Sequence, residues 1–365
     1  MPESAVLTQP PPVSPPASLP VRALRTIPGM LLLLVVGYGG KVIEEVVDHL
    51  AKVYHLRLPT GEYILWAIML GMIIANTTGV PEIFRSGVAT YEFWLKLGIV
   101  LLGARFVLSD LLRLGGISLI LVVFEIGFSL VFMTMLGRWF KLRPKLISLL
   151  AIGSSICGVS AILASCGVIG ADDEDTSYAI AAILALGAIS LVAFPLVGHS
   201  LHLSDHAYGL WAGLAVDNTA EATAAGAIYS DAAGKVAVLA KTCRSTMLGF
   251  VVLAYAVYWA TKGEARVVTN KAKFLWQKFP KFVLGFLAIS VLASFHYFSP
   301  AQTDSIANLS RWVFLLSFAG VGFRTNLREL GKQGARPFVV GLVGEIAIAA
   351  ITLGLVYTAG RFSTL

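Results

Sequence analysis

Residues 153–167 read "GSSICGVSAILASCG", an apolar stretch in which small and hydroxyl-bearing residues gather around Gly153 and Gly158. It lies inside a hydrophobic segment, 146–169, that is long enough to cross a bilayer. Glycine weakens a helix interior by about 1 kcal/mol relative to alanine, and Ser154 or Ser155 offers the side-chain oxygen that caps a helix start. We interpret the segment as a helix that breaks and restarts inside the membrane. Close helix packing through small residues is the alternative.

The whole chain has the composition of an integral membrane protein. Of its 365 residues 57% are hydrophobic and 13% are charged, and the mean hydropathy is +0.79, whereas about a quarter of a soluble domain is charged. Long apolar runs without strand-like alternation predict an all-helical, polytopic fold rather than a β-barrel. We count about eleven spans: 27–49, 62–79, 91–108, 117–137, 146–169, 177–199, 206–228, 236–260, 280–297, 306–323 and 337–359.

Lysine and arginine are concentrated in alternate links between these spans. Three basic links lie at 138–145, 262–281 and 328–336, whereas the link at 171–176 is acidic, with the sequence "ADDEDT". The positive-inside rule then predicts an inner (plasma) membrane protein with the N-terminus in the cytoplasm and the C-terminus outside. The net charge of +7 is read as a topology signal, and we expect no nucleic-acid partner.

The N-terminal stretch differs from the rest. Residues 1–26 contain "QPPPVSPPASLP" and lack an apolar core, which predicts a disordered, proline-rich cytoplasmic tail ahead of a transmembrane domain at 27–365. The three cysteines all fall in apolar spans, so no disulfide framework is indicated. No cysteine and histidine spacing suggests a metal, and we expect no cofactor.

Two parts of the sequence match each other. "GARFVLSDLLRLG" (103–115) aligns without gaps with "GFRTNLRELGKQG" (322–334), and Glu125 in the next span then faces Glu345. With eleven spans these segments run in opposite directions, the pattern of an inverted repeat in secondary transporters. Chance similarity of helix ends is the alternative. The matched pairs are spans three and four and the last two spans, so a simple five-plus-five duplication does not follow.

A second stretch places polar groups inside an apolar span. "GLAVDNTAEATAAG" (213–226) puts Asp217, Asn218 and Glu221 near its centre. Asn218 with a glutamate three residues later resembles a capping box, which marks a helix start. Ionisable residues at such depth are rare and mostly functional, although Glu221 could cap a helix that starts nearer the surface. A second broken helix is therefore predicted here.

A third stretch, "LAKTCRSTML" (239–248), carries Lys241 and Arg244 on one face of the eighth span. Snorkelling of Lys241 to the interface is the alternative. Two cations beside two broken-helix N-termini could hold a tetrahedral oxyanion, with Arg244 offering a bidentate fork. We predict proton-coupling roles for Asp217, Glu221, Glu125 and Glu345. The predicted substrate-binding residues are Ser154, Ser155, Cys157, Gly158, Ser160, Asn218, Thr219, Lys241, Thr242 and Arg244.

Four stretches also resemble one family. "LGIVLLGARFVLSDLL" (97–112), "GSSICGVSAILA" (153–164), "LWAGLAVDNTAEATAAG" (210–226) and "GFRTNLREL" (322–330) are similar, in this order, to the YeiH-type membrane proteins, a family of proposed sulfate exporters. The resemblance covers residue 27 to the end. It implies a multi-helix carrier with inverted repeats, broken crossing helices and exchange of a sulfur oxyanion. The chain departs from the expected "HDTSQ" pattern, having "VDNTAE" at 216–221.

The leading expectation is a secondary active transporter of a small inorganic oxyanion, with sulfate as the first candidate, working by export or proton-coupled exchange, with H⁺ or Na⁺ as the coupling ion, and assembled as a homodimer. A cation/proton antiporter and an organic-anion carrier are the alternatives within transport. A passive channel is also possible, and it would show no exchange coupling. A membrane-embedded hydrolase would need a catalytic motif such as HExxH or GxSxG within a span, and the sequence has none, so we expect no enzyme.

Overall fold

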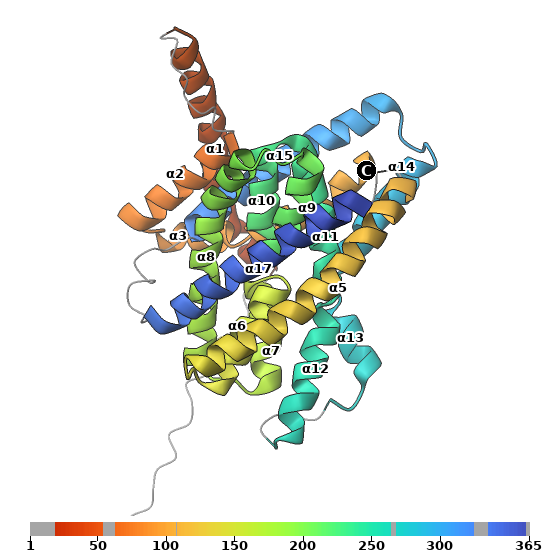
Figure 1. Ribbon diagram of the computed structural model, residues 1–365. Helices are drawn as coiled ribbons and strands as arrows, with labels where there is room; N and C mark the ends of the chain where they lie inside the picture. The colour runs from red at the N-terminus through yellow and green to blue at the C-terminus, as the bar shows by residue number, and fades with distance from the viewer. Residues whose placement is uncertain (1–18, 54–62, 107, 264–267, 325–334, 363–365) are drawn as a thin grey trace, which may run out of the picture.

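The computed structural model describes residues 19–53, 63–106, 108–263, 268–324 and 335–362, and all regular elements in these ranges are helices (Figure 1). The first half contains α1 (Leu19–Val53), α2 (Tyr63–Thr77), α3 (Glu82–Val88), α4 (Tyr91–Leu102), the 3₁₀ turn η1 (Gly103–Arg105), α5 (Leu108–Trp139), α6 (Pro144–Ser155), α7 (Val159–Ile169) and α8 (Asp173–Ser200). The second half contains α9 (Asp205–Ala215), α10 (Thr219–Tyr229), α11 (Asp231–Thr246), α12 (Leu248–Thr261), α13 (Lys271–Lys278), α14 (Phe282–Ser294), α15 (Pro300–Arg324) and α17 (Ala335–Phe362).

Helix α1 begins earlier than the sequence suggests. Residues 19–26 belong to α1, so the helix extends ahead of the boundary predicted at residue 27. The apolar stretch from which the first span, 27–49, was predicted is therefore only part of a longer helix. The rest of the predicted tail, residues 1–18, lies outside the described residues.

The number of helices that can cross a membrane is smaller than the predicted eleven. Seven described helical segments are long and apolar enough, or up to eight if α13 and α14, bent by 68° at their junction, form one span. Three predicted spans account for most of the difference: α2 is a shorter apolar helix, and 146–169 and 206–228 are each divided into two short helices. An all-helical, polytopic architecture is confirmed, whereas the count of eleven is not.

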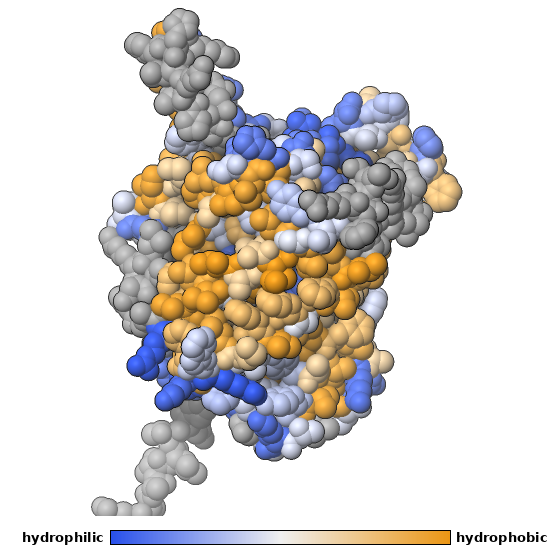
Figure 2. All heavy atoms as spheres, viewed as in Figure 1, coloured by the Kyte–Doolittle hydropathy of each residue, from blue (hydrophilic) through white to orange (hydrophobic). Residues whose placement is uncertain are grey.

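The surface has the pattern that a bilayer requires. Figure 2 shows a broad apolar band across the middle of the visible face, with hydrophilic residues gathered above and below it. Large apolar side chains stay exposed on α5 and α8, among them Ile120 (74% exposed) and Leu196 (63% exposed). Such a continuous apolar belt would be unfavourable in water and is stable against lipid.

Two long helices pack beside the broken ones. Helices α5 and α17 pack against each other and run in opposite directions across the molecule (Figure 1). Helix α11 packs against α9, α10 and α5, so the segment carrying Lys241 and Arg244 lies in the interior.

An inverted repeat requires antiparallel α5 and α17. The repeat itself stays a prediction, since residues 325–334 lie outside the described residues and the side chains of 108–115 are not described.

Candidate functional site

The first break separates α6 from α7 at residues 156–158. Helix α6 runs through Ser155, and α7 restarts after Gly158, whose φ of +64° and ψ of −126° suit glycine and few other residues. The expected cap by Ser154 or Ser155 is therefore wrong: both serines belong to the last turn of α6, and α7 has no side-chain cap. The break therefore falls at a glycine that adopts a positive φ.

The second break separates α9 from α10 at residues 216–218. Helix α9 ends at Ala215, and α10 starts at Thr219 with Asn218 as its N-cap. The side-chain oxygen of Asn218 accepts a hydrogen bond from the backbone N–H of Ala220 at 3.2 Å. The predicted helix start is confirmed, and the glutamate of the motif binds the cap side chain itself, since Asn218 Nδ2 donates to Glu221 Oε1 at 3.4 Å.

The two breaks meet in the protein interior. A Cβ atom built on Gly158 would lie 3.2 Å from Cβ and 3.3 Å from Cα of Asn218. A pair of broken helices whose ends approach each other is what the sequence predicts for 153–160 and 216–221, and the structure confirms it. Each crossing helix then exposes one C-terminal and one N-terminal end to its neighbours, and these ends carry unsatisfied carbonyl and N–H groups.

Arg244 binds the two C-terminal ends. Its Nε donates to the carbonyl of Ser155 at 2.8 Å and one terminal nitrogen donates to the carbonyl of Ser154, both at the end of α6. The other terminal nitrogen donates to the carbonyls of Leu214 at 2.5 Å and Val216 at 3.3 Å, at the end of α9. A guanidinium has five donors in a planar fork, so one side chain can satisfy both helix ends.

Lys241 completes the same arrangement one turn earlier on α11. Its ammonium donates to the carbonyls of Val216 and Asp217, each at 2.6 Å, and the side chain is fully buried. Positive charge at helix C-termini is favoured by the helix dipole. Snorkelling is therefore wrong for Lys241, because its nitrogen lies at the crossing rather than at the surface. Thr242, between the two cations, is also buried.

Two carboxylates lie beside Arg244, and two further buried glutamates contact α8. Glu125 Oε2 lies 3.2 Å from Arg244 Nε, and Asp217 Oδ1 lies 3.9 Å from an Arg244 terminal nitrogen, with all three side chains fully buried. Glu345 accepts a hydrogen bond from Ser190 of α8. Glu221 packs against α8 at Gly187, where a Cβ atom built on the glycine would lie 1.6 Å from Glu221 Oε2. Residues 187 and 190 share one face of α8, so both glutamates approach that face.

The two N-terminal ends open into a cavity of about 380 Å³. The residues around the start of α7 and of α10 supply one wall, and three lysines lie in the lining with Glu92, which itself forms ion pairs with Lys96 at 3.4 Å and with Arg324 at 3.1 Å. The lining residues are Tyr91, Glu92, Leu95, Lys96, Ile99, Cys157, Val159, Ser160, Asn218, Thr219, Ala220, Ser245, Leu248, Lys278, Pro280, Lys281 and Phe282.

The predicted binding residues therefore separate into two groups. Cys157, Ser160, Asn218 and Thr219 line the cavity. Arg244 and its neighbours lie behind them at the crossing; the cavity lining does not include Ser154, Ser155, Gly158, Lys241, Thr242 or Arg244. The division follows helix polarity, because a broken helix presents carbonyls at one end of the break and N–H groups at the other.

Sequence reasoning missed the lysines of the cavity. Lys278 and Lys281 were read only as markers of a basic link, and Lys96 was not considered. The signal available was Glu92 and Lys96 at i and i+4 inside an apolar span, since a charged pair at such a place is unusual. No local signal indicated that the link would fold back over the breaks.

Comparison with known proteins identifies the family to which this chain belongs. A family model described as "Conserved hypothetical protein 698" matches residues 28–341. The chain belongs to this family. A "UPF0324 membrane protein" of Nitratidesulfovibrio vulgaris is 36% identical over 340 residues, covering 90% of this chain and 93% of the relative. Another from Clostridium tetani is 32% identical over 308 residues, covering 81% of this chain and 89% of the relative.

A third relative, from Rhodopirellula baltica, is longer: it is 32% identical over 327 residues, covering 84% of this chain and 58% of the relative. The resemblance to YeiH-type proteins is confirmed by these matches. The names of the three relatives describe membrane proteins and state no substrate. No solved structure matches the chain. With its apolar helices, the protein is a multi-pass membrane protein.

Proposed function

We propose that this protein is a secondary active transporter of a small inorganic oxyanion, with sulfate as the first candidate. The observation that carries the proposal is the cavity in which the N-terminal ends of α7 and α10 meet the side chains of Lys96, Lys278 and Lys281. Helix N-termini and lysines both favour anions. A volume of about 380 Å³ falls in the range of small-ligand sites.

Magnitudes argue for the combination of both features. A helix N-terminus contributes about 0.3–2 kcal/mol to anion binding, whereas taking a charged group out of water costs far more. Full positive charges are therefore needed near a divalent anion. Lys278 and Lys281 supply charge in the lining, and the buried Lys241 and Arg244 add positive potential from behind the breaks.

The proposal assigns coupling to the buried acids. Glu125, Asp217, Glu221 and Glu345 outnumber Lys241 and Arg244, so full ionisation would leave uncompensated negative charge in the interior. Such charge is costly unless a proton or a metal cation such as Na⁺ accompanies it. A second candidate function, cation/proton antiport, rests on this same excess of acids.

The finer architecture belongs to the proposal too. We place the protein in the inner membrane with its N-terminus in the cytoplasm, as a homodimer built on inverted repeats. Two ion pairs support the repeat: Arg105 at the end of η1 lies 3.1 Å from Asp231 in the first turn of α11, and Arg324 at the end of α15 lies 3.1 Å from Glu92 in the first turn of α4. Each arginine that the repeat aligns thus pairs with an acid in the first turn of another helix.

Thermal unfolding of the purified protein with sulfate, sulfite, thiosulfate, phosphate, taurine and Na⁺ tests the substrate class. Oxyanions should raise the melting temperature, since a ligand that binds only the folded protein stabilises it. Lys278→Gln with Lys281→Gln should abolish that rise. The matched control is Lys271→Gln with Lys273→Gln, two exposed lysines that do not line the cavity. Stabilisation by Na⁺ alone would favour cation/proton antiport instead.

Counterflow in proteoliposomes tests the mechanism. Vesicles loaded with unlabelled anion should accumulate labelled anion transiently if the protein exchanges one for the other. A passive channel would only equilibrate the label. Absence of any anion flux, with hydrolysis of a membrane substrate, would show that the protein is an enzyme and overturn the proposal.

A further inference from the structure

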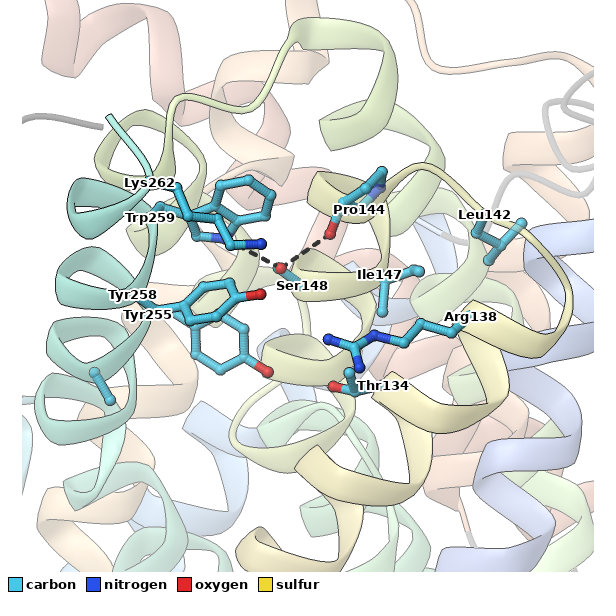
Figure 3. Close-up of a pocket in the computed structure, with 11 residues that line it drawn as sticks. Thr134, Arg138, Leu142, Pro144, Ile147, Ser148, Tyr255, Tyr258, Trp259 and Lys262 are labelled. Atoms are coloured by element: carbon cyan, nitrogen blue, oxygen red, sulfur yellow. Dashed lines mark hydrogen bonds between the residues drawn. The ribbon is translucent and has the colours of Figure 1, made fainter. Parts of the chain in front are cut away.

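A second cavity, of about 560 Å³, lies between the end of α5, the start of α6 and the end of α12 (Figure 3). It shares no lining residue with the cavity at the helix breaks. Its lining residues are Thr134, Arg138, Leu142, Pro144, Ile147, Ser148, Ala254, Tyr255, Tyr258, Trp259 and Lys262.

The polar groups of this cavity converge. Figure 3 shows the guanidinium of Arg138 and the ammonium of Lys262 reaching into it from opposite walls, with the hydroxyls of Tyr255 and Tyr258 directed toward the space between them. The ammonium of Lys262 lies 4.7 Å from the centre of the Tyr258 ring. Among the described residues no carboxylate lines the cavity, and neither cation forms an ion pair. Within the described residues, the cavity therefore brings two cations together with no carboxylate in its lining.

The inner wall of the cavity is closed. The indole N–H of Trp259 donates to Ser148 Oγ at 3.2 Å, and that hydroxyl donates to the carbonyl of Pro144 at 3.0 Å. Trp259 is only 3% exposed and Ser148 only 5%. Because these polar groups satisfy one another, the cations that a ligand could meet are Arg138 and Lys262 on the outer walls.

The level of the cavity matches a bilayer interface. Arg138 is in the last turn of α5, whose membrane-spanning segment ends at Trp139, and Lys262 directly follows α12, whose segment ends at Thr261. Trp139 is 80% exposed beside Arg138, as expected of the aromatic residues that lie at headgroup level. Apolar Leu142, Ile147 and Ala254 complete the walls. Charge, aromatic rings and apolar side chains occur together here, as they do in proteins at the headgroup level of a bilayer.

We propose that this cavity binds the phosphodiester headgroup of an anionic phospholipid, held between Arg138 and Lys262. Arginine offers a planar fork to phosphate oxygens, and lysine adds a compact charge. Basic pockets between helices at the cytoplasmic side recognise acidic headgroups by these means. A soluble anion would use only the cations, whereas a lipid also covers the apolar wall.

Lipid retention measured by native mass spectrometry tests the proposal. Delipidated protein is titrated with phosphatidylglycerol or phosphatidylcholine of equal chain length. Wild type should prefer phosphatidylglycerol. The double variant Arg138→Gln with Lys262→Gln should bind that lipid about thirtyfold more weakly, because each basic residue that is removed lowers the affinity by about fivefold. Lys271→Gln with Lys273→Gln removes the same charge from exposed positions and should keep the preference.

Two further arms separate the remaining outcomes. Arg138→Lys with Lys262→Arg keeps both charges and should keep the preference; if the double glutamine variant fails to fold, Lys262→Gln alone, at an exposed side chain, should lower it by about fivefold. Equal retention of both lipids by wild type would overturn the proposal. So would displacement of phosphatidylglycerol by millimolar inorganic phosphate, which would show a soluble-anion site.

Discussion

Arg244 and Glu125 form an ion pair where two broken helices cross, with Nε of the arginine 3.2 Å from Oε2 of the glutamate and both side chains fully buried. The same guanidinium binds carbonyls at the ends of α6 and α9. One side chain thus joins three segments that are far apart in sequence. The crossing depends on it for both charge balance and hydrogen bonding.

Arg244→Ala should destabilise the protein by about 3–5 kcal/mol, because it leaves Glu125 buried without its partner. Arg244→Lys keeps the charge but has one nitrogen, which cannot serve both helix ends, so its loss should be intermediate. The melting temperature in detergent is the measurement. Arg85→Ala, at a side chain that is 67% exposed, is the control and should stay within about 0.5 kcal/mol of wild type.

A double substitution tests whether Glu125 is what makes the loss large. Glu125→Gln combined with Arg244→Ala should cost less than the sum of the two single changes, since neither member of this ion pair then keeps a charge without the other. Strict additivity would show that the two residues stabilise the protein independently.

Local chemistry explains which features the sequence could predict. The break at Gly158 and the helix start at Asn218 depend on properties of single residues, the tolerance of positive φ and the capping of an N–H group, and these are visible in the sequence. Burial of Arg244 was also predictable, because the apolar residues around it indicate depth.

The partners of Arg244 were not predictable in the same way. Its position among apolar residues suits an anion site as well as a helix C-terminus, and only the crossing of α6 with α9 decides which carbonyls it meets. Likewise, the cavity contains Lys278 because α13 folds back toward α7, where Lys278 donates to the carbonyl of Ala164 at 2.6 Å. Contacts between distant segments have no local signature in one sequence.

Gly158→Ala should disturb the crossing severely. The new Cβ would meet Asn218 at 3.2 Å, and alanine is strained at a φ of +64°. Gly79→Ala is a matched control, since Gly79 also has a positive φ, of +74°, but has open space around it. If strain alone matters, both variants should lose similar stability; the close approach predicts a larger loss, by about 1–3 kcal/mol, for Gly158→Ala in the same unfolding measurement.

Gly187→Ala should displace Glu221, because the added Cβ would lie 1.6 Å from its Oε2. Anion exchange in proteoliposomes should fall while the protein remains folded, since a side-chain carboxylate can move where backbone cannot. Gly127→Ala, at a helical glycine with nothing within 4 Å, should leave exchange unchanged. Loss of exchange in both variants would point to helix rigidity rather than to Glu221.

Glu345→Gln should reduce the pH dependence of transport if the buried acids carry the coupling proton. The amide keeps the size of the side chain and its bond to Ser190 but cannot take up a proton. Ser190→Ala is the companion variant: it removes the hydroxyl that binds Glu345 and leaves the acid in place, so the pH profile should shift without flattening.

Exchange is measured between about pH 5 and pH 8 with equal anion on both sides, so that only proton binding differs. A profile of Glu345→Gln that matches wild type would exclude this residue, and the same measurement on Glu221→Gln, whose carboxylate lies against the same face of α8, would then decide whether either acid is involved.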